Sequence, residues 1–284
     1  MAPEVTAVIT THARPAFVRD ALASVQAETH KDLEIVVVDD GGTFDPPPHD
    51  RIRVMRGSNL GVARARNLGL DAARGEFIIY LDDDDVALPN RISSLLHAAR
   101  QTQASLCFGM TRRVVNGATS LLQDVPTHHG SSGAAGFGDL LACAPHVNAV
   151  LVRTETLRAA GGFDVEAHHF DDWSAWLRIA DREGVVWRIA ETVAEWRIHS
   201  DGLSGKLFHA GAMKLRLLAL FQRLRNRLSP ENARAIATAQ QVVASADIVT
   251  YDDYADAMSL HLVTTPPEIR APHRSPAEFA MSND

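Results

Sequence analysis

The chain has 284 residues, of which 35 are acidic and 28 are basic, so its formal net charge is −7. Hydrophobic residues make up 46% and charged residues 22%, which is typical of a globular protein with a sizeable core and argues against extensive disorder. The negative charge argues against general binding to nucleic acids, which depends on a basic surface. Two cysteines, Cys107 and Cys143, are too few for a disulfide scaffold and lack the paired spacing of a zinc site.

The N-terminal residues contain no basic region followed by an apolar stretch of the length that a signal peptide needs. The sequence also contains no run of about 18 apolar residues, the length at which a helix crosses a bilayer. From these two observations we expect a cytoplasmic protein.

The first half of the chain alternates predicted strands with predicted helices. The apolar runs at 33–38 and 77–81 indicate central strands that are buried on both faces. The predicted strands are 5–10, 33–38, 51–56, 77–81 and 105–115, and the predicted helices begin at Pro15 and cover 60–73 and 89–101. This order predicts an α/β fold, with a mostly parallel sheet flanked by helices. Ligands bind such sheets at the carboxyl ends of the strands.

The second half of the chain is less regular. The glycine-rich residues 127–138 indicate a loop, and Asp171–Asp172 precede a helix whose apolar face includes two tryptophans. The other predicted elements are a strand at 147–152, a short helix at 154–160, a strand at 185–198 and two helices after residue 206. The last residues, 266–284, contain four prolines and indicate a flexible tail.

Charge is unevenly distributed along the chain. Residues 206–234 hold seven basic residues and one acidic residue, a local charge of +6, so the rest of the chain carries −13. The predicted helix at 206–228 has a leucine-rich stripe, for which three alternatives are open. The stripe packs on the rest of the protein, pairs with its copy in a homodimer, or rests on the anionic inner face of a membrane as a peripheral contact.

Four consecutive aspartates, Asp82 to Asp85, directly follow the predicted strand at 77–81, and Asp39–Asp40 follow the strand at 33–38. Neighbouring carboxylates repel one another and need a counter-charge, unless they lie in a solvated turn, which is the alternative explanation. A divalent cation such as Mn²⁺ or Mg²⁺ supplies that charge, and it binds carboxylates together with phosphate oxygens. We therefore expect a metal site that recruits a diphosphate to this edge of the sheet.

Several short motifs, taken together, resemble those of a known family. They follow one another over about the first 205 residues, at 5–15 (VTAVITTHARP), 34–41 (EIVVVDDG), 59–69 (NLGVARARNLG), 75–85 (GEFIIYLDDDD), 161–164 (GGFD), 170–178 (FDDWSAWLR) and 197–199 (RIH). With these motifs in this order, the chain resembles the family 2 glycosyltransferases of the GT-A fold, which are inverting enzymes with a DxD motif. The resemblance implies a Rossmann-like GT-A sheet with a C-terminal helical extension. It also implies a transferase that moves a sugar from a nucleoside-diphosphate sugar to an acceptor hydroxyl.

The resemblance implies roles for individual residues as well. The residues that it places at the nucleotide sugar are Thr10, Thr11, Arg14, Asp39, Arg66, Asp82, Asp83 and Asp171. Asp84 is the implied metal ligand, His199 joins it at the metal or diphosphate, and Asp85 supports that site from behind. Asp172 is the implied catalytic base. The simpler explanation for Asp171 and Asp172 is that they cap the start of a helix.

The sequence departs from the family pattern at Ala13, where asparagine is common, at Asp171, where glutamate is usual, and at Ser174, where an acid is frequent. None of these positions is the implied metal ligand or base, so the departures bear on the acceptor. Two other functions stay open, a non-catalytic nucleotide-sugar-binding protein and a sugar-phosphate nucleotidyltransferase. The second would need a glycine-rich loop after the first strand, and residues 10–15 contain no glycine.

We therefore predict a GT-A catalytic domain at 1–205, in which residues 1–115 bind the nucleotide sugar and residues 116–205 bind the acceptor. A helical extension at 206–264 and a flexible tail at 265–284 follow. The expected partners are a UDP-, dTDP- or GDP-sugar and a hydroxyl acceptor, with no nucleic acid. The expected cofactor is Mn²⁺ or Mg²⁺.

Overall fold

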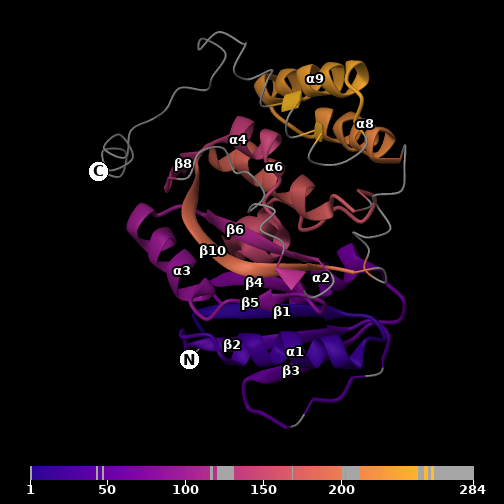
Figure 1. The fold of residues 1–284 in the computed structure, drawn as a ribbon. Coiled ribbons are helices and arrows are strands. Elements are labelled where there is room, and N and C mark those ends of the chain that lie inside the picture. The colour runs from indigo at the N-terminus through magenta and orange to yellow at the C-terminus, as the bar shows by residue number, and fades with distance from the viewer. Residues whose placement is uncertain are drawn as a thin grey trace.

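Figure 1 shows the fold of the computed structural model. A mixed sheet lies at the centre with helices on both of its faces, and the last two labelled helices, α8 and α9, lie together at one end. The residues that the structure describes are 2–42, 44–46, 48–115, 118–119, 131–167, 169–199, 202, 212–248, 253–254 and 257–258.

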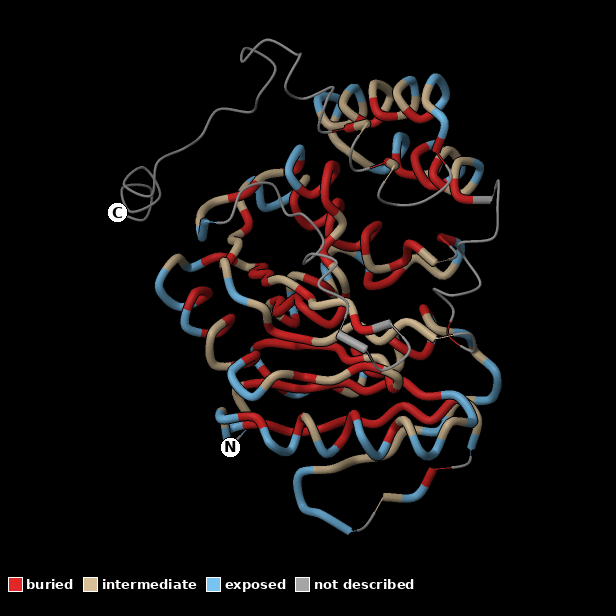
Figure 2. Tube along the Cα trace, in the orientation of Figure 1, coloured by how far each residue is buried: buried red, intermediate tan, exposed pale blue. Residues whose placement is uncertain are grey.

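The first half of the chain forms the parallel part of the sheet, in the order β3-β2-β1-β4. These strands are β1 (Val5–Thr11), β2 (Leu33–Asp39), β3 (Ile52–Arg56) and β4 (Phe77–Asp82). Every residue of β1 and β2 is buried, and Figure 2 shows the central strands in red. The helices that cover them are α1 (Pro15–Gln26) and α3 (Arg91–Thr102) on one face, and α2 (Val62–Ala72) on the other. The predicted central strands are therefore confirmed.

The second half of the chain makes the sheet mixed. Strand β9 (Val150–Arg153) lies antiparallel between β4 and β6 (Leu106–Val115). The remaining strands are β10 (Val186–Ile198), parallel to β6, β5 (Val86–Ala87) and β8 (Gly133–Ala135), antiparallel to β10, and β7 (Ala118–Thr119), antiparallel to β6. The predicted α/β class with flanking helices is confirmed. The sequence did not predict the antiparallel direction of β9, because an apolar run that is buried on both faces carries no signal of its direction.

The register of the parallel strands gathers polar side chains at one edge of the sheet. Thr10 of β1 lies beside Asp82 of β4, and Thr11 lies beside Asp39 of β2. All four residues are at the carboxyl ends of their strands, where the sequence predicted the ligand.

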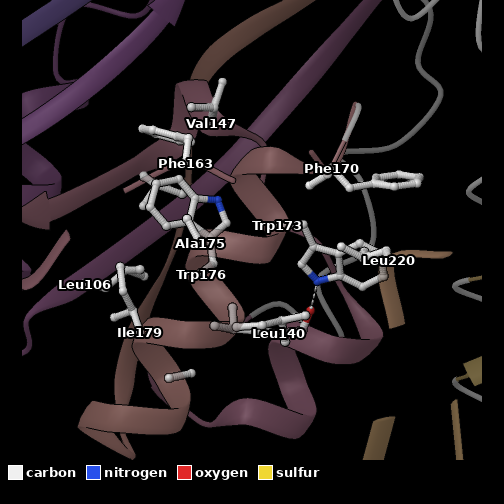
Figure 3. Packing of buried hydrophobic residues seen from close by; sticks show 14 of the residues in the cluster. Leu106, Leu140, Val147, Phe163, Phe170, Trp173, Ala175, Trp176, Ile179 and Leu220 are labelled. Carbon is white, nitrogen blue, oxygen red and sulfur yellow. Dashed lines mark hydrogen bonds between the residues drawn. The ribbon is translucent and has the colours of Figure 1, made fainter. Parts of the chain in front are cut away.

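Helix α6 (Asp171–Glu183) carries its two tryptophans into the core, as its periodicity predicted. Figure 3 shows Trp173 and Trp176 with different neighbours. The Trp173 indole donates a hydrogen bond to the Leu140 carbonyl at 2.7 Å, and the Trp176 ring meets Phe163 edge-on at 5.9 Å. The smaller elements nearby are α4 (Phe137–Ala142), the 3₁₀ turn η1 (Val147–Ala149) and α5 (Thr154–Ala159). Helix α6 is thus fixed in the core from its first turn onward.

The C-terminal helices α8 (Ala212–Arg225) and α9 (Pro230–Ser245) belong to the same hydrophobic core as α6. The leucine-rich stripe of α8 is buried there, and its members are Met213, Leu217, Leu220, Phe221 and Leu224. Asp164 accepts hydrogen bonds from Arg223 at 3.1 Å and from Arg227 at 2.6 Å. Of the three alternatives for this stripe, the structure therefore shows packing on the rest of the protein.

Some expectations fall on residues outside the described ranges. The predicted boundary at residue 205 and the predicted tail at 265–284 are among them, so the division into domains stays a prediction. Within the predicted loop at 127–138, the described residues 131–138 form β8 and the start of α4. None of the helices in the described part of the chain is long and apolar enough to cross a membrane.

Replacement of Phe221 by alanine tests whether α8 is part of this core. The Phe221 ring is fully buried and packs edge-on against Trp173 at 5.8 Å. We expect the variant to lose about 3–5 kcal/mol of unfolding free energy, the usual cost of deleting a buried aromatic ring. The measurement is urea denaturation followed by circular dichroism.

The matched control for this experiment is Leu215→Ala on the same helix. The Leu215 side chain is 69% exposed, so its removal is expected to change the unfolding free energy by less than about 0.5 kcal/mol. A Phe221→Ala protein with an unchanged main unfolding transition would contradict the inclusion of α8 in the core.

Candidate active site

A cavity of about 830 Å³ opens at the carboxyl ends of the parallel strands. One wall comes from the end of β1 and the start of α2, and the other comes from the start of α6 and the end of β10. The predicted site residues that line it are Thr10, Thr11, Arg14, Arg66, Asp82, Asp84, Asp171, Asp172 and His199. Asp39 and Asp83 are buried behind the cavity wall. The fold thus brings the two halves of the predicted site to one cavity.

Arg66 of α2 joins the two walls. Its Nη1 donates to Asp171 Oδ2 at 2.8 Å, and its Nη2 donates to the two carboxylate oxygens of Asp82 at 2.8 and 3.0 Å. Burial alone would lower the pKa of Arg66, but the carboxylates of Asp171 and Asp82 raise it well above its usual value. The guanidinium therefore stays charged and holds the end of β4 against the start of α6. Its predicted contact with the nucleotide stays a prediction.

Asp83 and Asp84 share a second arginine. The buried Asp83 accepts from Thr11 Oγ1 at 2.6 Å, and it pairs with Arg14 through Nε at 3.1 Å and through Nη2. The remaining nitrogen, Arg14 Nη1, donates to Asp84 Oδ2 at 2.7 Å, and His199 Nε2 lies 3.2 Å from the same oxygen. The structure thus places the two predicted metal ligands, Asp84 and His199, side by side. Asp83 is fully buried, whereas the Asp84 side chain is 14% exposed. Burial raises the pKa of Asp83 to about 7.

Asp39 shapes the loop that follows β2. Its carboxylate accepts hydrogen bonds from three backbone amides of that loop, at 2.7 to 3.2 Å, and pairs with Arg56. Its predicted contact with the nucleotide base stays a prediction. The neighbouring Asp40 accepts from the amides of Leu60 and Gly61 at 2.7 and 2.9 Å and lines the cavity. Asp40 therefore fixes the loop from which α2 begins.

Asp171 and Asp172 occupy the first turn of α6, and the capping position before them is Phe170. Neither acid is therefore the capping residue that the simpler explanation required. Asp171 forms an ion pair with Arg66, whereas Asp172 faces the cavity and accepts a hydrogen bond from the Trp173 amide at 2.7 Å. Burial and the charge of Asp171 raise the pKa of Asp172 to about 7. A carboxylate of this kind is suited to take a proton near neutral pH.

His146 is a cavity residue that no sequence motif indicated. A ring nitrogen of His146 and carboxylate oxygens of Asp82 and Asp85 lie within 4.8 Å of one another. Burial lowers the pKa of His146 to about 4, so the ring is neutral at neutral pH. Its ring lies 5.0 Å from that of Trp196, and the Arg113 guanidinium lies 5.2 Å from the Trp196 ring. These residues are far apart in the sequence, so their spacing gave no signal.

The described residues therefore include an aspartate-rich group that can hold a cation. Carboxylate oxygens and a neutral imidazole nitrogen are both ligands that divalent metal ions accept. Within this group Asp85 is tied to the protein, because it accepts from the Arg197 amide at 2.7 Å and from the Asn148 side chain. Asp84 lines the cavity beside His199. The residues present thus fit a divalent cation.

Comparison with known proteins identifies the family that this site resembles. Residues 6–131 match the family described as glycosyl transferase family 2. An uncharacterized glycosyltransferase of Rickettsia felis is 27% identical over 190 residues, which are 64% of this chain and 31% of that protein. A GalNAc(5)-diNAcBac-PP-undecaprenol beta-1,3-glucosyltransferase of Campylobacter jejuni is 34% identical over 112 residues, 36% of each chain. The present chain spans about a third of the length of these two relatives.

Solved structures extend the similarity to the fold. The TarS fragment 1–349 of S. aureus in complex with UDP-GlcNAc has a TM-score of 0.68 at 12% identity, over 94% of this chain and 82% of that one. The mannosyltransferase PcManGT of Pyrobaculum calidifontis, in complex with GDP-Man and Mn²⁺, has a TM-score of 0.61 at 15% identity, over 100% and 82%. The predicted resemblance to family 2 glycosyltransferases and the predicted GT-A fold are both confirmed. The names of the relatives support the prediction of a transferase enzyme.

Replacement of Arg66 by glutamine tests its part in joining the walls of the cavity. The change leaves the buried Asp171 and the partly exposed Asp82 without their shared counter-charge. We expect a loss of about 3–5 kcal/mol of unfolding free energy, the usual cost of breaking a buried ion pair on one side. Urea denaturation measures it.

The control is Arg64→Gln, which removes the same charge from an exposed position two residues earlier on α2. Its unfolding free energy is expected to stay within about 0.5 kcal/mol of wild type. Equal unfolding free energies of the two variants would show that the bridge through Arg66 does not stabilise the fold.

Proposed function

We propose that this chain, which shares the sequence pattern of family 2 glycosyltransferases and the GT-A fold, transfers a sugar from a nucleoside-diphosphate sugar to an acceptor hydroxyl with inversion. The observation that carries the proposal is the bridge from Asp82 through Arg66 to Asp171. It sets the acid-rich end of β4 opposite the first turn of α6 across one cavity. A donor at the first wall and a base at the second are the two parts that a direct transfer needs.

The nucleotide sugar belongs at the wall formed by β1 and α2. Thr10, Thr11 and Arg14 line this wall, and the residues from Leu60 to Arg66 continue it. The bound UDP-GlcNAc of TarS and GDP-Man of PcManGT support a donor of this class. We infer that the donor carries UDP, dTDP or GDP.

The cation, Mn²⁺ or Mg²⁺, would be held by Asp84 and His199 together with the donor phosphates. When bound, it neutralises the negative charge of the leaving diphosphate. Support for this assignment comes from the 3.2 Å approach of His199 to Asp84 and from the exposure of both side chains to the cavity. The neutral His146 beside Asp82 and Asp85 is the alternative nitrogen ligand.

Asp172 accepts the proton of the acceptor hydroxyl. Asp171 forms an ion pair with Arg66, so of the two neighbouring acids Asp172 is the one suited to act as the base. The hydroxyl oxygen forms a bond to the anomeric carbon as the bond to the diphosphate breaks on the opposite face. One displacement of this kind inverts the configuration, by analogy with inverting glycoside hydrolysis.

The acceptor is expected at the apolar part of the cavity, which is formed by Ala144, Phe170, Trp196 and Met213. The name of the Campylobacter jejuni relative contains a lipid-linked saccharide, so the proposal includes a saccharide acceptor. Contact with a second copy or with a membrane would have to use another surface than the buried stripe of α8.

Two other functions were open from the sequence. A non-catalytic nucleotide-sugar-binding protein has no role for a cavity carboxylate such as Asp172, which lies beside the Arg66 bridge but makes no hydrogen bond to Arg66 in the described structure. A sugar-phosphate nucleotidyltransferase would need a glycine-rich loop after β1, and residues 10–15 form none. Both observations favour the transferase.

Replacement of Asp172 by asparagine separates catalysis from binding. A thermal-shift panel of nucleotide sugars with Mn²⁺ first identifies the donor, because a ligand of the folded state stabilises it. We expect Asp172→Asn to lower kcat by about 10²- to 10⁴-fold, the usual contribution of a general base, and to leave the donor-induced thermal shift unchanged. The exposed Asp71→Asn is the control and is expected to keep wild-type kcat. Near-normal turnover of Asp172→Asn would refute the assignment of the base.

The pKa of Asp172 also predicts a pH dependence. The base acts in its deprotonated form, and the pKa of Asp172 is raised to about 7. We therefore expect kcat/KM to rise about tenfold per pH unit below pH 7 and to level off above it. The measurement is a pH profile of the wild type, with the residual activity of Asp172→Asn as reference. A profile that is flat from pH 5 to pH 8 would contradict the prediction.

A further inference from the structure

Arg14 stands where the metal site and the donor cavity meet. One edge of its guanidinium, Nε with Nη2, binds the buried Asp83, and the remaining Nη1 donates to Asp84 Oδ2. The Arg14 side chain is 29% exposed and lines the cavity, whereas that of Arg66 is 6% exposed and is bound by carboxylates on both sides. Arg14 can therefore change the partner of Nη1 without leaving Asp83.

Phe17 holds the groups around Asp84 in place. The His199 ring stacks on the Phe17 ring at 5.0 Å, and the guanidinium of Arg14 lies 5.7 Å from the centre of the same ring. Arg197 approaches this ring at 5.8 Å. A single aromatic side chain of α1 thus supports both partners of the Asp84 carboxylate. Asp83 on one side and Phe17 on the other keep Arg14 at this place.

This arrangement makes Arg14 and a metal ion compete for one oxygen. Asp84 Oδ2 is the oxygen that Arg14 Nη1 and His199 Nε2 both approach. Like charges a few ångströms apart repel one another strongly at the effective dielectric constant of a protein surface, so a divalent cation beside Arg14 is opposed. A diphosphate removes this opposition, because its oxygens can accept from Arg14 and bind the cation together.

We propose that Arg14 couples cation binding to donor binding. In the absence of donor it serves as the counter-ion of Asp84 and weakens cation binding there. When a nucleoside diphosphate enters, Nη1 moves from Asp84 to the diphosphate, and Asp84 becomes available to the cation. Asp83 is the anchor that keeps the guanidinium in reach of both partners. The inference rests on the proposed function and adds to it the order in which the site fills.

The test is the affinity for Mn²⁺ with and without nucleotide. Free Mn²⁺ is followed by electron paramagnetic resonance in titrations of the full chain alone, with UDP, with dTDP and with GDP. For the wild type we expect nucleotide to tighten Mn²⁺ binding by at least about 10-fold, within the usual range of coupling between sites. For Arg14→Gln we expect Mn²⁺ alone to bind about 5-fold more tightly than to wild type or better, and the coupling to fall by a similar factor.

Two further variants make the result specific. Arg19→Gln removes the same charge from an exposed position of α1 and is expected to match wild type in both titrations. Arg14→Lys keeps the charge but cannot hold Asp83 and Asp84 at once, because it lacks the planar fork. We expect Arg14→Lys to show reduced coupling as well, and it decides the question if Arg14→Gln does not fold, which thermal unfolding reports.

The outcomes separate this inference from the proposed function. Independent binding of Mn²⁺ and nucleotide to the wild type overturns the inference, and so does unchanged coupling in both Arg14 variants. Either result assigns Arg14 a structural role and leaves the proposed transferase standing. Failure of the wild type to bind UDP, dTDP, GDP and Mn²⁺ at all would contradict the proposed function itself.

Discussion

Arg66 is the residue on which the geometry of the candidate site depends, since its guanidinium is shared between Asp82 and Asp171. Without this guanidinium between them, the buried Asp171 and the partly exposed Asp82 would repel each other or take up protons. The two acids come from the end of β4 and the start of α6, so the arginine fixes the separation of the two cavity walls as well as their charge. A lysine cannot replace it, because only the planar guanidinium reaches two carboxylates with separate nitrogens.

Other acidic residues are also paired with hydrogen-bond donors or cations, as Asp82 and Asp171 are paired with Arg66. Each buried acid near the cavity has a partner: Arg14 for Asp83, and the Asn148 side chain with the Arg197 amide for Asp85. Farther from the cavity, Asp164 accepts hydrogen bonds from Arg223 and Arg227, which belong to the basic segment at 206–234. Two basic residues of this segment, Arg223 and Arg227, therefore help to attach the C-terminal helices to the rest of the protein. Asp84 differs from the buried Asp83 and Asp85 in that its side chain is 14% exposed, and it shares Arg14 with Asp83.

Some of this could be predicted from the sequence, and the limits have physical reasons. The apolar runs of β2 and β4 and the spacing of Trp173 and Trp176 on α6 follow periodicities that are set locally. The meeting of Asp82 and Asp171 was implied only by the family resemblance, because it depends on the order of strands in the sheet. The antiparallel direction of β9 has no local signal at all.

Single side chains at the site show the same limit. His146 lies in an irregular segment before η1, and nothing in its neighbours marks it as a cavity residue. The approach of both Arg14 and His199 to one oxygen of Asp84 brings together positions of which His199 and Asp84 are more than a hundred residues apart. Motifs identify residue types in order along the chain, but they do not show which carboxylate pairs with which cation.

In the proposed reaction, donor and base act from opposite walls of one cavity, which Arg66 holds together. The most direct test is the anomeric configuration of the product, read by proton nuclear magnetic resonance from the coupling of the anomeric hydrogen during the reaction with the identified donor. The account predicts a product whose anomeric configuration is opposite to that of the donor. A product with the donor's configuration would contradict it, since retention needs a second displacement or attack from the same face.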